Sequence, residues 1–295
     1  MCDARNVYDT IELISAIGVQ KSKQRIDHTI IKSFLAGVLL SFSGLFLIIV
    51  GGGSAPLAQS LGPGIQRMIQ AAVFPIGLIL IVMTGADLFT GNTMTLMIST
   101  LHKKTTWFDL IISWVVSYFG NLAGCLFYHS ILVYYAGVIS DDPYRSFAVQ
   151  IATVKGNIPW HQMFLRGIGG NWLVCLAILL GITGRDLHSK IIGIFLPIWL
   201  FVAVRYEHSI ANMFLVQVGM MLGANLSVGK YISCVMIPVT LGNIIGGAFF
   251  VGIAYWYLYI LKNVDAGVKD DVSQVVQNQN KLNQSEQFVS ITLGF

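Results

Sequence analysis

Charged residues are scarce in this chain, and apolar residues are abundant. Lys, Arg, Asp and Glu make up 11% of the 295 residues, whereas hydrophobic residues make up 55%. Because soluble domains carry about 25% charged residues, this composition excludes an ordinary soluble domain. The mean hydropathy is +0.71, and apolar runs of about 20 residues are long enough to cross a bilayer. The sequence therefore predicts an integral membrane protein.

Signals for several other kinds of site are missing as well. None of the four cysteines forms a CxxC pair, so we expect small core residues rather than a disulfide framework or a metal site. There is no HExxH motif and no basic block of the nucleic-acid type. The net charge of +4 is spread out and does not oppose an anionic ligand. We expect no metal, no cofactor and no nucleic-acid partner.

Six apolar segments follow one another along the chain. We expect membrane spans at about residues 30–50, 67–101, 107–136, 162–182, 190–224 and 231–261. The second is interrupted between Thr84 and Asn92, and the fifth at Glu207 and His208. The fold class predicted is all-α, with six transmembrane helices of which the second and fifth are broken.

The segments outside these spans are more polar. Residues 1–29 are predicted to form a cytosolic segment with a surface helix, residues 30–262 a transmembrane domain, and residues 263–295 a disordered cytosolic tail. We expect loops at 51–63 and 137–160. The first apolar run is too long for a cleaved signal peptide. Basic residues are more frequent in the loops on the side of the termini, which places both termini in the cytosol, and we expect the plasma membrane.

The two halves of the transmembrane domain repeat one another, at about residues 30–136 and 160–262. The recurring markers are Phe34–Gly37 with Phe164–Gly167, Pro75 with Pro197, Asp87 and Asn92 with Glu207 and Asn212, and Phe119–Gly124 with Leu241–Gly246. Because each half has three spans, the second half must be inverted relative to the first. Inverted repeats with paired broken segments near the midplane are the sequence sign of a transport site.

The two breaks carry the polar chemistry. A break inside a bilayer frees backbone groups, which are tolerated only within protein or against a cavity. Asp87 and Glu207 begin the breaks, so we expect each carboxylate to cap the following half-helix, with a proton-carrying role as the alternative. Asn92 and Asn212 are expected to hold loop backbone in the same way. Inward-pointing half-helix N-termini create a positive potential that suits a small anion.

His208 and a set of apolar residues accompany these breaks. Histidine has an ordinary pKa near physiological pH. At a break and beside an acid, we interpret His208 as functional, with a hydrogen-bonded structural role as the alternative. The flanking apolar residues are interpreted as constrictions that exclude ions by dewetting, with ordinary helix packing as the alternative. These residues are Phe74, Leu78, Leu88, Phe89 and Phe201.

Three stretches resemble the formate/nitrite transporter family: Gly85–Asn92, Tyr206–Met213 and Ile237–Gly247. The resemblance covers about residues 20–262. It implies an aquaporin-like protomer that assembles as a homopentamer with a pore in each subunit. It also implies roles for particular residues and places the family's apolar slits at the five residues above. The family's central histidine, first-loop threonine, loop lysine and pore asparagine fall on His208, Thr90, Lys155 and Asn171.

One position departs from the family pattern. The residue two before the Glu-His pair is commonly glycine, and here it is Arg205. If the helix continues, Phe201 and Arg205 share a face, and Arg205 would attract anions and shift substrate preference. If the helix bends first, Arg205 would pair with an acid at a subunit contact. The sequence leaves both alternatives open.

The function predicted is a transporter or channel for small monovalent weak-acid anions, and not an enzyme. The resemblance favours formate or nitrite, coupled to protons, with passage as the neutral acid; lactate, acetate and hydrosulfide are the alternatives. A membrane-embedded enzyme using Glu207 and His208 is more remote, because catalysis needs a converging nucleophile or metal set. An aquaporin-type channel would need two Asn-Pro-Ala loops, and proline follows neither Asn92 nor Asn212. The partners expected are the anion, protons and the lipid bilayer.

Overall fold

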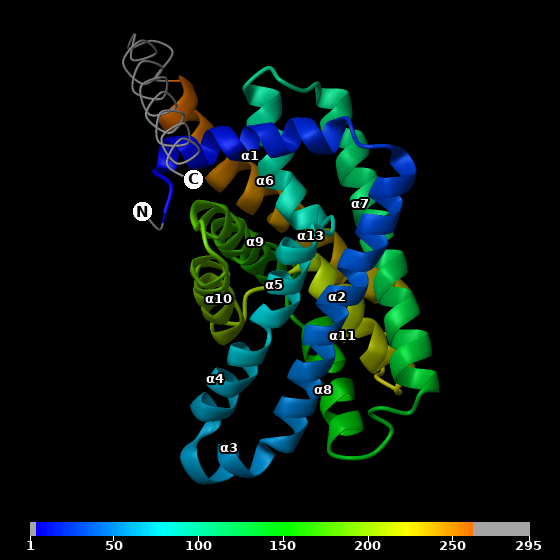
Figure 1. Ribbon diagram of the computed structural model, residues 1–295. Helices are drawn as coiled ribbons and strands as arrows, with labels where there is room; N and C mark the ends of the chain where they lie inside the picture. Colours follow the sequence, from blue (N-terminus) through cyan, green and yellow to red (C-terminus); the bar gives the residue numbers. More distant parts are fainter. Residues whose placement is uncertain (1–3, 262–295) are drawn as a thin grey trace, which may run out of the picture.

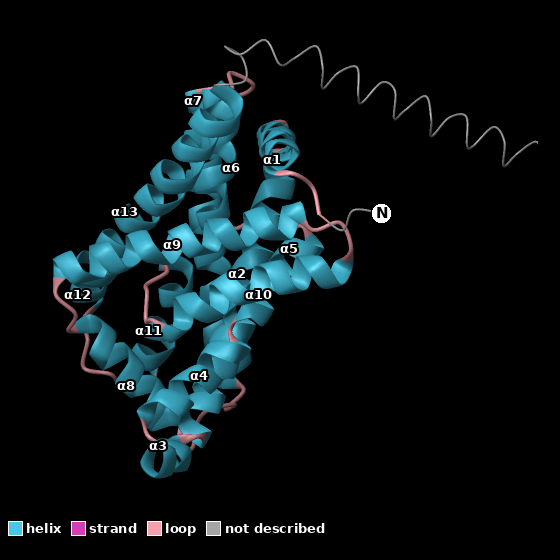
Figure 2. Ribbon diagram, turned by 90° about the vertical axis from the view of Figure 1, so that its left-hand side faces the viewer, coloured by secondary structure: helices cyan, strands magenta, loops and turns pink. Residues whose placement is uncertain are grey.

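The computed structural model describes residues 4–261, and the predicted tail at 263–295 lies outside the described residues. Within this range the chain is helical, with helices joined by short loops (Figures 1 and 2). The first half contains α1 (Val7–Ser22), α2 (Ile26–Gly53), α3 (Ala55–Leu61), α4 (Pro63–Val73), α5 (Pro75–Thr84), α6 (Phe89–Leu101), α7 (Trp107–Phe127) and η1 (Tyr128–Tyr135). The second half contains α8 (Tyr144–Gly156), α9 (Trp160–Thr183), α10 (Leu187–Ala203), α11 (Ser209–Met221), α12 (Val228–Lys230), η2 (Tyr231–Met236), α13 (Ile237–Ile244), η3 (Ile245–Ile253) and η4 (Trp256–Leu261).

Several of these elements join into runs that are long enough to cross a membrane. The described residues contain five such helical runs: Ile26–Gly53, Pro63–Thr84, Trp107–Tyr135, Trp160–Thr183 and Val228–Leu261. The helices α10 and α11 are apolar but shorter. The prediction of an all-helical membrane protein is confirmed at this level.

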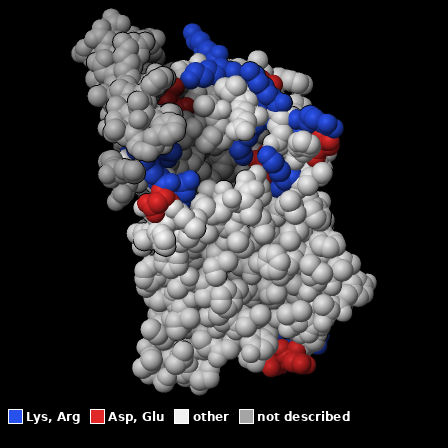
Figure 3. Space-filling view, viewed as in Figure 1, with Lys and Arg blue, Asp and Glu red and all other residues white. Residues whose placement is uncertain are grey.

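The two ends of the molecule carry most of its charge. Helix α1 lies at one end, and α3 and α8 lie at the other, and we call these the α1 end and the α8 end (Figure 1). On the face shown in Figure 3, Lys, Arg, Asp and Glu gather at the two ends and leave a broad uncharged belt between them. A belt of this kind is what the hydrocarbon core of a bilayer requires.

The repeated sequence markers lie at close helix crossings. A Cβ atom on Gly124 of α7 would come within 2.0 Å of the Phe34 carbonyl oxygen on α2. Its repeat partner Gly246 would come within 2.2 Å of the Ile168 carbonyl oxygen on α9 in the same way. Small residues let helix backbones approach closely inside a bilayer. The two crossings therefore need glycine at both positions.

Two segments that we expected to be loops contain helices. Helix α3 lies within the predicted loop 51–63, and α8 lies within 137–160. Helix α8 buries Ala148, Ala152 and Gly156 on one side, and its other side is exposed. The polar residues of that exposed side hid this amphipathic pattern. The prediction of loops was wrong because a helix lying at the surface of the bundle needs only one apolar stripe.

Candidate functional site

A lysine, an acid and an asparagine meet at the first break, which separates α5 from α6. The Lys21 Nζ atom lies 2.6 Å from Asp87 Oδ1 and donates to Asn92 Oδ1 at 2.7 Å. Asn92 Nδ2 also donates to Asp87 Oδ1 at 2.8 Å. Asp87 and Asn92 are buried. Lys21 comes from α1, so the buried carboxylate is neutralised from the α1 end.

The second break, between α10 and α11, repeats this arrangement from the opposite end. The Lys155 Nζ atom, on α8, lies 2.5 Å from Glu207 Oε2. Asn212 Nδ2 donates to the same oxygen at 2.9 Å. Each break therefore holds a lysine, an acid and an asparagine. The structure brings these predicted residues together, and it adds Lys21, which the sequence showed only as a basic residue of a surface helix.

The expectation that Asp87 and Glu207 cap the half-helices is wrong. The N-cap residue of α6 is Leu88, which makes no side-chain cap bond, and the N-cap residue of α11 is His208. Asn92 and Asn212 do not hold loop backbone through their amide groups; these donate to the two carboxylates. Charge-assisted contacts with lysine are stronger than bonds between neutral groups, which explains why the acids turn toward lysine and asparagine.

Two other asparagines form hydrogen bonds with the backbone at the starts of α6 and α11. The sequence analysis identified neither of them as a site residue. Asn121 Oδ1 accepts from the Phe89 N–H at 2.9 Å, and its Nδ2 donates to the Asp87 carbonyl at 2.9 Å. Asn243 Oδ1 accepts from the Ser209 N–H at 2.8 Å, and its Nδ2 donates to the Glu207 carbonyl at 3.0 Å. We call Asn121 and Asn243 the clamp asparagines. Their place in the repeated Gly-Asn markers was the signal that would have identified them.

The two breaks meet at a histidine and a threonine. The Nε2 atom of His208 lies 2.9 Å from the Thr90 Oγ1 atom. The other ring nitrogen, Nδ1, accepts a hydrogen bond from the Ala211 N–H at 3.1 Å. Because a backbone N–H can only donate, these contacts assign the neutral tautomer with its proton on Nε2. Thr90 then accepts from His208 and keeps its own hydroxyl proton for another acceptor.

The five apolar residues predicted as constrictions are all buried. Phe74, Leu78, Leu88, Phe89 and Phe201 are each at most 4% exposed and lie in one core cluster. The ring centroid of Phe201 is 6.1 Å from that of Phe74 and 6.1 Å from that of His208. Phe89 directly precedes Thr90, and its ring packs edge-on against Tyr118. The Phe201 ring therefore lies beside His208, and Phe89 is the chain neighbour of Thr90.

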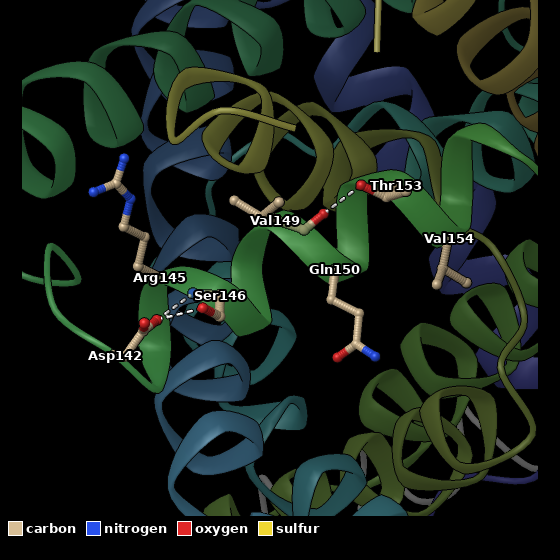
Figure 4. Close-up of a pocket in the computed structure, with 7 residues that line it drawn as sticks. All are labelled: Asp142, Arg145, Ser146, Val149, Gln150, Thr153 and Val154. Carbon is tan, nitrogen blue, oxygen red and sulfur yellow. Dashed lines mark hydrogen bonds between the residues drawn. The ribbon is translucent and has the colours of Figure 1, made fainter. Parts of the chain in front are cut away.

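Nothing in the described part of the chain gathers ligands for a metal ion. Among residues 4–261 there is no group of three or more His, Cys, Asp or Glu side chains placed to hold one. A surface recess of about 440 Å³ lies on α8 and involves none of the residues above (Figure 4). Its lining residues are Asp142, Arg145, Ser146, Val149, Gln150, Thr153 and Val154. The chemistry of the breaks is therefore that of paired charges, half-helix termini and one neutral imidazole.

Comparison with known proteins agrees with this arrangement. The family model described as Formate/nitrite transporter matches residues 8–257. The chain belongs to this family. A relative described as "Probable formate transporter", from Methanothermobacter thermautotrophicus, is 40% identical over 266 residues, which cover 85% of this chain and 96% of the relative. The sequence-based assignment to the formate/nitrite transporter family is confirmed.

Solved structures of the family have the same fold. One described as "FNT family ion channel" matches with a TM-score of 0.77 and 27% identity, over 85% of this chain and 98% of that one. Another, described as "Pentameric formate channel with formate bound", matches with a TM-score of 0.69 and 31% identity, over 80% and 98%. Because these relatives are transporters and channels, the prediction that the chain is not an enzyme is confirmed.

Asn171, where the family resemblance places a pore asparagine, uses its amide group to join the two breaks. Its Nδ2 atom donates to the Asn243 carbonyl at 2.6 Å and to Thr93 Oγ1 at 2.9 Å, and it lies 3.3 Å from the Thr90 carbonyl. The residue is fully buried. These contacts connect the first turn of α6 to the clamp asparagine of the second break.

Arg205, the departure from the family pattern, lies after the end of α10. The helix ends at Ala203, and Arg205 has a φ of 59°, in the left-handed region. Glycine adopts this conformation freely, whereas another L-residue pays about 1–2 kcal/mol. This geometry gives a physical reason for glycine in the family. Because the helix does not continue, Phe201 and Arg205 do not share a helical face.

Proposed function

We propose that this chain is a membrane channel or transporter for small monovalent weak-acid anions, with formate or nitrite as the first substrates to test. Lactate, acetate and hydrosulfide are the alternatives within the same class. The observation that carries the proposal is the Thr90–His208 pair at the meeting of two breaks. Family membership and the names of the relatives support the choice of substrate.

The proposed architecture has six spans in two inverted repeats. Helices α4 to α6 would form the second span and α10 to α11 the fifth, each interrupted at a break. The matching sets Lys21, Asp87, Asn92 and Lys155, Glu207, Asn212 support the inversion, because they lie toward opposite ends. We further propose a homopentamer in the plasma membrane, with the α1 end and both termini in the cytosol.

An anion would first meet positive potential at either entrance. Lys155 is paired with Glu207 but keeps 18% of its side chain exposed, and Lys21 keeps 25%. The N-termini of the half-helices α6 and α11 add positive potential without net charge. A monovalent anion would therefore be attracted toward the breaks without being held there by an unpaired lysine.

Passage between the constrictions would require loss of the anion's charge. Moving an unpaired ion into a low-dielectric interior costs several kcal/mol, whereas a neutral acid avoids this cost. In the proposed mechanism, the anion takes a proton from the solution on the side of entry, directly or through water. His208 then acts in its neutral form and orients the Thr90 hydroxyl, which keeps its proton and donates a hydrogen bond to the solute. The neutral acid passes Phe201 and Phe74 on one side and Leu88 and Phe89 on the other.

Uptake into proteoliposomes tests the proposed function. We expect saturable uptake of formate or nitrite that depends on the protein. Vesicles that contain correctly assembled protein, yet take up neither anion nor lactate nor hydrosulfide, would contradict the proposal.

A further inference from the structure

Three arginines converge where α10 ends, on the side of the α8 end. Arg205 follows α10, Arg67 lies on α4 and Arg166 lies on α9. Two hydrogen bonds join these elements. Trp199 Nε1 donates to the Met68 carbonyl at 3.2 Å, and the Glu207 N–H donates to the Arg166 carbonyl at 3.2 Å. The positive charges of Arg67 and Arg166 repel the positive charge of the Arg205 guanidinium.

This arginine cluster has no acidic partner in the part of the chain that the structure describes. None of the ion pairs between residues 4 and 261 includes Arg67, Arg166 or Arg205. The Nε atom of Arg67 is buried without a hydrogen-bond partner. The Arg166 guanidinium donates to the Gln162 side chain, at 3.4 Å. Three like charges placed together are unfavourable unless an anion joins them.

Two acids toward this end already have partners. Glu207 is paired with Lys155, and Asp142 accepts from the Ser146 N–H at 3.0 Å on the loop before α8. Arg205 also holds a strained left-handed conformation. Strained residues of this kind are concentrated at ligand sites. The cluster therefore has the charge and the rigidity of an anion site whose anion comes from outside the protomer.

An apolar groove begins beside the cluster and runs along α9 and α10. It has a volume of about 240 Å³. Its lining residues are Gly169, Trp172, Leu173, Leu176, Leu200, Val204 and Tyr206. Arg166 lies one turn before Gly169, and Arg205 lies between Val204 and Tyr206. Leu200 is 50% exposed and Val204 47%, so the groove opens on the outside of the protomer rather than into the breaks.

We propose that Arg67, Arg166 and Arg205 bind the phosphate of a membrane phospholipid, with one acyl chain in the groove between α9 and α10. Guanidinium groups donate bidentate hydrogen bonds to phosphate. Arg67 is the fifth residue of α4, and Arg166 is the seventh residue of α9. At a rise of about 1.5 Å per residue, they lie about 6 and 9 Å along their helices from the N-terminal ends. Arginine side chains at such depths reach the headgroup level.

The lipid site does not depend on which anion crosses the membrane. In this proposal Arg205 lies on the outside of the protomer. A bound lipid would fill the space between the end of α10 and the helices α4 and α9. Charge complementarity with phosphate and the apolar lining of the groove both favour a phospholipid over a small soluble anion, which would leave the groove empty.

Lipid binding to the purified protein in detergent tests this assignment. Phosphatidylglycerol is compared with a diacylglycerol of the same chains, which lacks the phosphate, and with inorganic phosphate, which lacks the chains. Bound lipid is counted by native mass spectrometry, and the oligomeric state is read from the same spectra. The variants are Arg205→Gly, which suits the left-handed backbone, and Arg67→Gln with Arg166→Gln. The control is Arg145→Gln, which removes an arginine on α8 outside the cluster.

We expect the native protein and the Arg145→Gln control to retain phosphatidylglycerol, and the cluster variants to lose at least tenfold in apparent affinity. Diacylglycerol and inorganic phosphate are each expected to bind weakly to all of them. Equal retention of phosphatidylglycerol by the cluster variants would overturn the proposal. So would tight binding of inorganic phosphate alone, or a loss of oligomers in the variants without a change in bound lipid. The last result would assign the cluster to a carboxylate on a second copy of the chain.

Discussion

The Nε2 atom of His208 lies 2.9 Å from the hydroxyl oxygen of Thr90, although the two residues are 118 positions apart in the chain. His208 begins α11 and Thr90 lies in the first turn of α6. The contact therefore joins the starts of two half-helices from the two sequence repeats. It is also the place where a neutral imidazole and a free hydroxyl proton meet between apolar side chains.

The ring of His208 has two roles that substitution can separate. It caps α11 through Nδ1, and it contacts Thr90 through Nε2. Asparagine is a good N-cap residue, whereas alanine is not, and loss of a cap costs about 0.5–2 kcal/mol. We expect His208→Asn to keep the thermal stability of the native protein and to lose acid-stimulated uptake. His208→Ala should lose both. An Asn variant with the native pH profile of uptake would contradict a role for the imidazole.

Lys155 neutralises a buried carboxylate, so its removal should be costly. Glu207 is 3% exposed, and leaving a buried charge without its partner costs about 3–5 kcal/mol. We expect Lys155→Met to lower the melting temperature strongly, and the double variant with Glu207→Gln to recover most of it. Uptake should stay low in both. Lys230→Met is the control, because Lys230 is an exposed lysine at the same end that donates to Asn157. A double variant no more stable than Lys155→Met would argue against the pairing.

The clamp asparagines should limit local unfolding at the first turns of α6 and α11. Asn243 makes three buried hydrogen bonds, to Ser209 N–H and to the Gly167 and Glu207 carbonyls. Each buried group left unsatisfied costs about 1–3 kcal/mol. We expect Asn243→Ala to speed hydrogen exchange at the Ser209 amide, and Asn121→Ala to do the same at Phe89. The exposed Asn157→Ala should change neither amide. Unchanged exchange in both clamp variants would exclude this role.

Asp186 gives a pH prediction outside the membrane spans. Hydrogen bonds from the Ser189 backbone and side chain lower the pKa of this carboxyl below its ordinary value. A lowered pKa in the folded state means that the bonds stabilise the protein above the unfolded pKa and cease to do so as the pH falls through the folded pKa. We expect the melting temperature of Asp186→Asn to fall less steeply than the native value below about pH 4. Parallel curves would show that the carboxylate contributes nothing.

The sequence was informative where chemistry recurs at fixed spacing. Asp87 with Asn92, and Glu207 with Asn212, are separated by five residues in each repeat, and this spacing paired the two breaks with one another. It did not reveal that the carboxylates face lysine rather than backbone, because that choice depends on contacts across the fold. Lys21 lies 66 residues from Asp87, and a lysine on an amphipathic helix is indistinguishable in sequence from a solvated one.

Backbone geometry explains most of what could not be predicted. Whether Arg205 shares a face with Phe201 depends on the residue at which α10 ends, and helix ends are the least certain feature of a sequence pattern. Likewise, α8 was hidden by its exposed polar side. The clamp asparagines stood in a visible repeat, but only the folded chain shows that their side chains reach the first peptide group of each half-helix.

The measurement that tests the central claim most directly is formate uptake into proteoliposomes at a fixed formate concentration, with the outside solution at about pH 6 and at about pH 8, on either side of the ordinary histidine range. It is made with and without an imposed membrane potential, and His208→Asn serves as the matched variant. Passage as the neutral acid predicts that uptake rises as the outside pH falls and does not change with the potential. Uptake that is independent of pH and follows the potential would mean that the anion itself crosses the constrictions, and would contradict the account.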